Sequence, residues 1–209
     1  MTRKKTTAPK RAPVVTSDDL RKRRKREKPD AQLETRELYR GKIITLNRDT
    51  VCFPDGSTAE LDIVRHSGAA AVVPFLNDPE GNEPQILMIR QYRYAAGGYI
   101  YEIPAGRLDE NELPDACAAR ELKEETGCTA ERIDSLTSFL TTPGFTDEAI
   151  HLFMATGLVH GEPNREPDEF ADLVIMYLSE ALELIHGGEI VDAKSILGLL
   201  FAAGFKTGQ

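Results

Sequence analysis

The sequence predicts a layered α/β domain preceded by a small antiparallel β-sheet. Apolar runs of strand length recur from Ala69 onward, and helical segments with start and stop signals lie among them. A strand, turn, strand pattern precedes the first of these runs. Strands mixed with a few helices are typical of a layered α/β architecture, so we expect a mixed sheet covered by helices.

The first 31 residues differ from the rest of the chain in charge. Residues 1–30 hold 12 Lys or Arg and 4 Asp or Glu, a net charge of +8, and the remaining 179 residues carry a net charge of −16. Because residues 1–31 contain almost no large apolar side chains, we expect a disordered, solubilising tail. A nucleic-acid-binding arm, a nuclear signal and an organelle address are the alternatives. The acidic remainder excludes nucleic-acid binding across its surface.

Residues 32–67 are predicted to form the small N-terminal sheet. Strands are expected over residues 37–46, 49–53 and 59–64, with a turn at Pro54-Asp55-Gly56-Ser57. A sheet of this size is marginal on its own and needs a partner surface. It therefore predicts a docking or dimerisation layer.

The main domain is expected over residues 68–209. Within it, residues 104–106 should break a strand, and a helix should start at Pro114 and stop at Gly127. The other elements are expected as strands over 69–76, 85–92, 99–103, 135–140, 149–158 and 170–178, and as helices over 179–186 and 192–203.

The composition excludes several classes of protein and of metal site. No apolar run approaches the roughly 18 residues that a membrane helix needs, so we expect a soluble, cytoplasmic protein with no membrane partner. Three cysteines without CxxC spacing predict neither a disulfide framework nor a zinc site, and four histidines are scattered. Any metal ion must therefore be held by carboxylates.

One helix carries such carboxylates. Glu121, Glu124 and Glu125 stand at i, i+3 and i+4, on one helix face, where like charges repel unless a cation or Arg120 compensates. Oxygen ligands in a cluster suit Mg²⁺ or Mn²⁺. An exposed acidic helix with ordinary Glu/Arg pairs, such as Arg120 with Glu124, is the alternative interpretation.

The flanking residues favour the metal site. Residues 106–127 read GRLDENELPDACAARELKEETG and match the pattern G-x5-E-x7-R-E-U-x-E-E-x-G-U, except that Cys128 takes the last, usually aliphatic, position. This segment resembles the Nudix box, and the chain is similar to Nudix hydrolases over roughly residues 36–203. The resemblance implies an α/β/α sandwich with a mixed sheet.

The resemblance also implies site roles. Glu121 and Glu125 would ligate Mg²⁺ directly, Glu124 would ligate it directly or through water, and the Ala105 carbonyl would add a ligand. Glu112 would hold Arg120, which in turn would orient the glutamates. Mn²⁺ is the alternative ion.

Two further segments resemble the ADP-ribose pyrophosphatase group. They are Gln91-Tyr92-Arg93 with Tyr101-Glu102-Ile103-Pro104-Ala105-Gly106 upstream, and Thr142-Pro143-Gly144-Phe145-Thr146-Asp147-Glu148 downstream. Arg93 is a candidate clamp for substrate phosphates because guanidinium groups match phosphate oxygens, and a salt bridge is its alternative role. Glu102 is a further substrate-binding candidate, and Tyr92 and Phe145 could stack on adenine.

The catalytic base is expected in the loop over residues 161–169. The resemblance favours Glu169, with Glu166 as the second candidate, and Glu162, Asp168 and Asp172 stay open. A Pro-rich loop offers no periodicity by which to choose among them.

The expected function is metal-dependent hydrolysis of the pyrophosphate of a nucleoside diphosphate sugar, with ADP-ribose as the substrate and AMP and ribose 5-phosphate as products. A GDP-mannose or other sugar pyrophosphatase, a non-catalytic nucleotide-sugar sensor, and a hydrolase of capped RNA or NAD are the alternatives. The resemblance implies a homodimer formed through the N-terminal sheet.

Overall fold

The structure is a computed structural model that describes residues 31–162 and 171–204. Contacts divide the chain into two compact units. The first contains the chain up to Arg36 together with Arg48–Leu61, and the second contains Glu37–Asn47 and the chain from Asp62 onward. The candidate site residues that the structure describes belong to the second unit.

The N-terminal antiparallel sheet predicted from the sequence is present. Its strands are β1 (Gln32–Arg40), β2 (Thr45–Cys52) and β3 (Thr58–Arg65), in the order β1-β2-β3. The predicted strand over residues 37–46 is wrong, because the chain turns within it: the Gly41 amide donates to the Ile44 carbonyl at 2.9 Å. The predicted turn after Phe53 is confirmed, with Gly56 at a φ of 84°.

A four-stranded mixed sheet forms the centre of the second unit. It contains β4 (Ala69–Pro74), β7 (Ala105–Arg107), β8 (Thr129–Leu140) and β9 (Ala149–Val159), in the order β7-β4-β9-β8. β4 runs parallel to β9 and antiparallel to β7, and β8 and β9 are antiparallel. Every residue of β4 is buried, as expected for a continuous apolar strand covered on both faces.

A second, antiparallel sheet has the order β10-β5-β6. Its strands are β5 (Gln85–Arg93), β6 (Gly98–Glu102) and β10 (Ala171–Tyr177), and the short 3-10 helix η1 (Tyr94–Ala96) joins β5 to β6. An isolated bridge between Phe75 and Ile86 links the end of β4 to β5. This sheet brings Arg93 and Glu102 to neighbouring strands.

In the described part of this unit the α-helices are α2 (Pro114–Thr126), α3 (Leu178–Gly187) and α4 (Ala193–Ala202). The predicted limits of α2 are confirmed, since Pro114 is its first residue and Gly127 ends it at a φ of 76°. α4 begins after Asp192, whose side chain accepts a hydrogen bond from the Ser195 amide.

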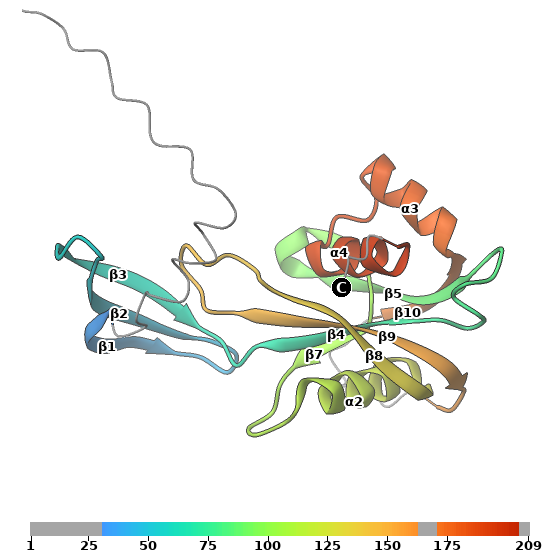
Figure 1. Cartoon of the computed structure of the whole chain (residues 1–209), viewed down its shortest axis with the longest axis horizontal. Coiled ribbons are helices and arrows are strands. Elements are labelled where there is room, and N and C mark those ends of the chain that lie inside the picture. Colours follow the sequence, from blue (N-terminus) through green and yellow to red (C-terminus); the bar gives the residue numbers. More distant parts are fainter. Residues whose placement is uncertain (1–30, 163–170, 205–209) are drawn as a thin grey trace, which may run out of the picture. The chain divides into compact units, whose positions relative to one another are not determined.

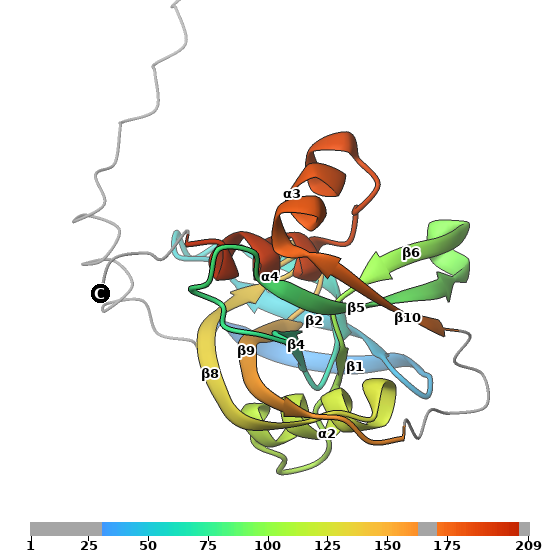
Figure 2. The ribbon, with the colours of Figure 1, turned by 90° about the vertical axis from the view of Figure 1, so that its right-hand side faces the viewer.

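The helices cover opposite faces of the sheets. Alternate residues of β4 point to two core clusters, one holding Ala69, Ala71 and Val73 and the other Ala70 and Val72. The first cluster includes the packing residues of α3 and α4, and the second includes Ala118 and Leu122 of α2. Figures 1 and 2 show α2 on one side of the sheets and α3 and α4 on the other. The predicted α/β/α sandwich is therefore confirmed.

Two further predicted boundaries are corrected. β8 begins at Thr129 rather than near Ser135, because it is an edge strand whose first half is mostly polar and shows no continuous apolar run. The predicted break at residues 104–106 is instead at Ile103 and Pro104, between the end of β6 at Glu102 and residues Ala105–Arg107, which pair with β4. The strand expected over 170–178 is β10, although Phe170 lies outside the described residues. No helix in the described part of the chain is long and apolar enough to cross a membrane.

Candidate active site

Arg120 is the centre of a carboxylate cluster on α2. Its Nε and Nη2 donate to the two oxygens of Glu112, each at 2.9 Å, which is a paired contact that fixes the plane of the guanidinium. Glu112 also accepts the Asp109 amide at 2.9 Å, and Arg120 Nη2 donates to the Arg107 carbonyl at 3.0 Å. The loop before α2 and the helix itself are thereby joined through one side chain.

The same guanidinium contacts two of the clustered glutamates. Arg120 Nη1 donates to Glu121 Oε1 at 2.6 Å and to Glu124 Oε2 at 3.0 Å. The positive charge of Arg120 offsets the repulsion that glutamates at this spacing exert on one another. The compensation expected from the sequence is therefore present in the fold.

Ala105 and Gly106, at the start of β7, lie against two glutamates of the cluster. The Ala105 amide donates to Glu125 Oε2 at 3.0 Å, and a β-carbon built on Gly106 would lie 1.8 Å from Glu121 Oε1. Only a residue without a side chain leaves the Glu121 carboxylate in this position. The backbone of β7 and two glutamates of α2 are thus gathered at one place.

This arrangement suits a hard divalent cation. Glu121, Glu125 and the neighbouring Ala105 carbonyl are all oxygen donors, which is the donor set that Mg²⁺ and Mn²⁺ prefer. Among residues 31–162 and 171–204, no group of three or more His, Cys, Asp or Glu side chains is arranged so that it could hold a metal ion by itself. Glu121 and Glu124 pair with Arg120, and Glu125 accepts a hydrogen bond from the Ala105 amide.

The cluster shifts the pKa values of its members. Hydrogen bonding from Arg120 lowers the pKa of Glu112 from 4.5 to about 2, and hydrogen bonding to Glu112 raises the pKa of Arg120. Cys117 lies beneath the cluster, with its Sγ 3.6 Å from the Gly106 carbonyl and 3.4 Å from the Arg107 carbonyl. Burial raises the pKa of its thiol to about 12, so Cys117 stays neutral and packs as an apolar group.

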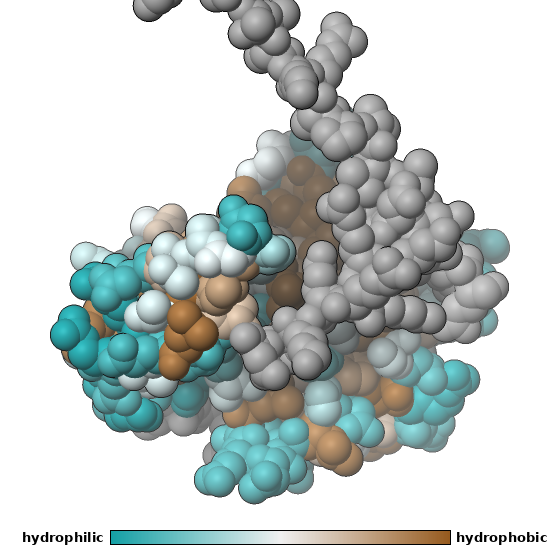
Figure 3. Space-filling view, turned by 60° about the vertical axis from the view of Figure 1, so that its left-hand side comes forward, coloured by the Kyte–Doolittle hydropathy of each residue, from teal (hydrophilic) through white to brown (hydrophobic). Residues whose placement is uncertain are grey.

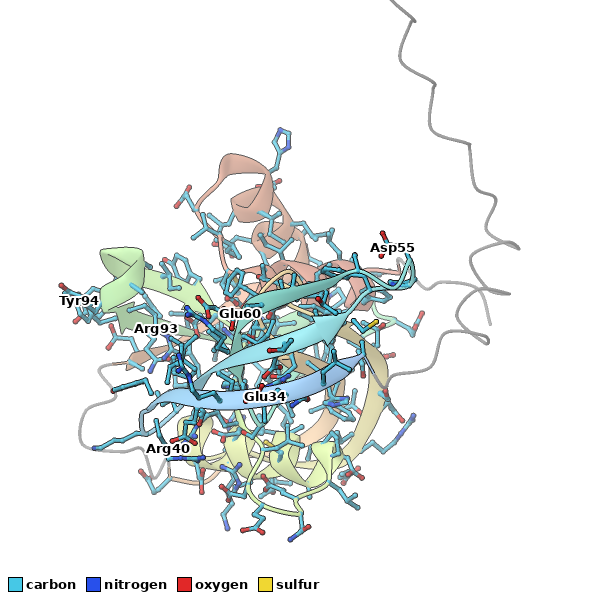
Figure 4. The ribbon with its side chains drawn as sticks, turned by 90° about the vertical axis from the view of Figure 1, so that its left-hand side faces the viewer. Glu34, Arg40, Asp55, Glu60, Arg93 and Tyr94 are labelled. Carbon is cyan, nitrogen blue, oxygen red and sulfur yellow. The ribbon has the colours of Figure 1, made fainter. Side chains whose placement is uncertain are left out.

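Arg93 and Glu102 form a second charged site on the β5–β6 hairpin. Arg93 Nε and Nη2 donate to the two Glu102 oxygens at 2.9 and 2.7 Å, so the salt bridge considered as an alternative role for Arg93 is present. The Glu102 side chain is 4% exposed and that of Arg93 is 42% exposed. Figure 4 shows Arg93 at the end of β5 and the adjacent Tyr94 projecting outward. The guanidinium is therefore anchored by Glu102 in a side chain that is partly exposed.

The two aromatic candidates, Tyr92 and Phe145, are both partly exposed. Tyr92 is half-exposed and meets Tyr99 edge-on, with ring centroids 5.5 Å apart. Phe145 is exposed in the loop after β8, and its backbone bonds to Val64 and Thr142.

Both candidates for the catalytic base, Glu166 and Glu169, lie outside the described residues. The described chain ends on this side at Glu162, one of the residues around a surface cavity of about 500 Å³ beside α2. The other residues around the cavity are Ala119, Arg120, Lys123, Glu124, Thr129, Ala130 and Ile133. The cavity therefore connects the carboxylate cluster with the start of the predicted base loop.

Sequence reasoning missed three residues near Glu102. Lys194 Nζ donates to Glu102 Oε2 at 3.0 Å, Asp192 contacts Lys194, and Ser195 accepts the Ile103 amide. The helix-start signal Asp192-x-x-Ser195 was visible in the sequence. Its contact with a segment 92 residues away was not, because no local pattern encodes that distance.

A layered α/β fold with an arginine-centred carboxylate cluster on a loop–helix element defines the class of Nudix-type hydrolases. Comparison with known proteins agrees with this class. The sequence model of the NUDIX domain matches residues 66–197. The chain therefore belongs to the NUDIX domain family and is a Nudix hydrolase.

Individual relatives are consistent with the family. The chain is 41% identical over 171 residues to a protein of Bacillus methanolicus named methanol dehydrogenase activator, covering 81% of this chain and 90% of that one. It is 38% identical over 167 residues to the ADP-ribose pyrophosphatase of Bacillus subtilis (strain 168), covering 79% and 88%. A solved structure described as an ADP compounds hydrolase has the same fold, with a TM-score of 0.69, 20% identity, and coverage of 82% of this chain and 91% of that chain.

Proposed function

We propose that this protein hydrolyses the pyrophosphate bond of ADP-ribose to give AMP and ribose 5-phosphate. The observation that carries the proposal is the cluster in which Arg120 and the Ala105–Gly106 backbone hold Glu121, Glu124 and Glu125 together. The named activity of the Bacillus subtilis relative supports ADP-ribose as the substrate. Hydrolysis of nucleoside diphosphate sugars is the broader activity to which this belongs.

Glu121, Glu125 and the Ala105 carbonyl would hold Mg²⁺ or Mn²⁺, with Glu124 as a direct or water-mediated ligand. When bound, a divalent ion neutralises pyrophosphate charge and acidifies the attacking water. Glu112 keeps the guanidinium of Arg120 in one plane, and Arg120 keeps Glu121 and Glu124 from separating. These residues would hold the ligand oxygens in place before the substrate arrives, which reduces reorganisation during reaction.

Arg93 would bind the negatively charged part of the substrate. Its guanidinium is anchored by Glu102, and the Arg93 side chain as a whole is 42% exposed, which suits contact with phosphate oxygens. Tyr92 and Phe145 are proposed to contact the adenine. Glu169, or else Glu166, is proposed to take the proton from the attacking water.

We also propose a homodimer and the domain division expected from the sequence, with a tail over 1–31, a sheet over 32–67 and the hydrolase domain over 68–209. Large apolar side chains are exposed on and beside strands β1–β3: Leu33, Leu38, Tyr39, Ile43, Ile44, Phe53 and Leu61. The face in Figure 3 shows hydrophobic patches among hydrophilic residues. Exposed apolar residues on a small sheet are typical of an interface.

Product analysis tests the hydrolase proposal. The wild type and Glu125→Gln are mixed with Mg²⁺ and, separately, with ADP-ribose, GDP-mannose, ADP-glucose, NAD and capped RNA. We expect AMP and ribose 5-phosphate to form fastest from ADP-ribose, with the rate lowered on the order of 100-fold or more in Glu125→Gln. Glu183→Gln is the matched control, because Glu183 is exposed on α3, away from the cluster.

Other outcomes would select other functions. Faster hydrolysis of GDP-mannose would change the substrate and keep the mechanism. Binding of a nucleotide sugar without hydrolysis would favour a sensor, a possibility that the Bacillus methanolicus relative supports, since it is named for activating another enzyme. Comparing binding of RNA to the full chain and to a chain lacking residues 1–30 across salt concentrations would test the tail.

A further inference from the structure

Glu102 is a buried carboxylate held between two cations from distant parts of the chain. Its Oε2 accepts from Arg93 Nη2 at 2.7 Å and from Lys194 Nζ at 3.0 Å, and its side chain is only 4% exposed. A buried charge is costly unless it is paired and hydrogen-bonded. The two cations therefore share the charge of Glu102 in this position.

The network continues into the start of α4. Lys194 Nζ also contacts Asp192 Oδ2 at 3.0 Å, and Asp192 caps the helix by accepting from the Ser195 amide at 3.0 Å and hydroxyl at 2.6 Å. Ser195 Oγ accepts the Ile103 amide at 2.8 Å. Figures 1 and 2 both place α4 beside the sheet that contains β5 and β6. The helix start is thus fastened to the strand that carries Glu102.

The charges of the four groups in this network alternate in sign and sum to zero. Arg93 and Lys194 supply the positive charges, and Glu102 and Asp192 supply the negative charges. Burial alone would raise the pKa of Glu102, but hydrogen bonding from Arg93 and the charge of Lys194 outweigh burial and lower it. Glu102 therefore stays negative, and its charge is shared between the two cations.

This balance leaves Arg93 able to bind another anion. A guanidinium has five N–H groups, and two of them donate to Glu102, which leaves three for other acceptors. The paired contact with Glu102 also fixes the direction in which those three groups point. Without Lys194, the cluster would carry a net charge of −1, and Arg93 alone would have to neutralise Glu102.

We propose that Lys194 is a positioning residue for substrate binding: by sharing the charge of Glu102, it keeps Arg93 available to the phosphate oxygens of a nucleoside diphosphate. This inference rests on the proposed function. Lys194 itself need not touch the substrate, since its side chain is 14% exposed and contacts Glu102 and Asp192. Its effect should appear in substrate affinity rather than in the chemical step.

The test compares steady-state hydrolysis of ADP-ribose by the wild type, Lys194→Met and Arg132→Met. We expect KM to rise about tenfold in Lys194→Met while kcat changes less than about threefold, because the lost charge balance weakens binding and leaves the glutamate cluster untouched. Arg132→Met is the matched control. It removes a cation that pairs with Asp134 at 2.7 Å on the surface, and it should leave both constants unchanged.

A second variant separates charge from packing. Lys194→Met combined with Asp192→Asn returns the cluster to zero net charge, and asparagine keeps the capping contact with Ser195. We expect this double variant to recover a KM within about threefold of the wild type. Lys194→Arg, which keeps the charge, should also stay nearer to the wild type than Lys194→Met. Thermal unfolding and Mn²⁺ titration should show that every variant is folded and binds the ion as the wild type does.

The inference is overturned if KM in Lys194→Met stays within twofold of the wild type, or if the double variant is no better than the single one. In both cases hydrolysis by the wild type would leave the proposed function intact. A wild type that hydrolyses no member of the substrate panel would overturn the proposed function and this inference together. If Lys194→Met fails to fold, the inference is tested by comparing Lys194→Arg with the wild type. Because Lys194→Arg keeps the positive charge, a tenfold higher KM in this variant would count against the inference.

Discussion

The carboxylate of Glu121 lies so close to the backbone of Gly106 that a β-carbon at Gly106 would stand 1.8 Å from Glu121 Oε1. Residue 106 belongs to β7 and residue 121 to α2, so this contact sets the distance between the loop and the helix of the candidate site. It also explains why the pattern begins with glycine. The requirement is space for a carboxylate, since Gly106 is not among the residues with a positive φ.

Gly106→Ala should weaken binding of the divalent ion by about 10- to 100-fold, the range seen when groups around metal ligands are changed. The added methyl group displaces the end of the Glu121 side chain, which is flexible, so the loss of thermal stability should be small. Gly98→Ala is the control, because a β-carbon at Gly98 meets nothing within 4 Å. Mn²⁺ titration of both variants checks the prediction, and equal affinities in the two would contradict it.

Arg120→Lys should lower kcat/KM by on the order of 100-fold. Arginine here donates to Glu112, Glu121 and Glu124 at once, and a single ammonium group cannot reproduce that planar set of contacts. The measurement is steady-state hydrolysis with saturating Mg²⁺. Arg132→Lys, at an exposed ion pair, should stay within about twofold of the wild type, and an equal response of the two variants would argue against the role of Arg120.

Acid should weaken the contribution of Glu112 to stability. Its pKa is about 2 in the folded chain against an ordinary value of 4.5, so the unfolded chain binds more protons between these values. The contribution is present in full above pH 4.5 and is lost as the pH falls toward 2. We expect the free energy of unfolding in urea to fall less steeply in Glu112→Gln than in the wild type over this range. Parallel curves for the two proteins would exclude the pairing with Arg120 as the cause.

Leu122→Ala should lower the free energy of unfolding by about 2–5 kcal/mol, the usual cost of removing a buried leucine side chain. Leu122 is fully buried in the core cluster between α2 and the mixed sheet. Leu113→Ala, at a residue that is 68% exposed, should change it by less than about 0.5 kcal/mol. Urea unfolding followed by circular dichroism measures both, and similar losses would show that α2 does not pack through Leu122.

The local features of the fold could be predicted from the sequence. Pro114 and Gly127 mark the ends of α2, the apolar run from Ala69 predicts β4, and the spacing of Glu121, Glu124 and Glu125 places them on one helix face. Each of these signals comes from residues within a few positions of one another. Backbone geometry and side-chain period act over that range, so the sequence alone determined them.

The short strand β7 and the turn at Gly41 were not predicted. β7 has three residues, and its pairing with β4 is what makes it a strand rather than a loop. The turn after Arg40 interrupts a run that otherwise reads as one strand, because strand propensity depends on the partner strand more than on the residue itself.

Only the tertiary structure decided how the candidate site is held together. Arg93, Glu102 and Lys194 become neighbours because the β5–β6 hairpin and the start of α4 meet in the folded chain, across 92 residues between Glu102 and Lys194. Arg120 likewise reaches Glu112 and the Arg107 carbonyl only after the loop folds back on α2. The sequence by itself predicted the candidate site residues, whereas the packing of distant elements decided which charges face one another. The reason is that electrostatic pairing depends on distance in space, which residue spacing along the chain does not encode.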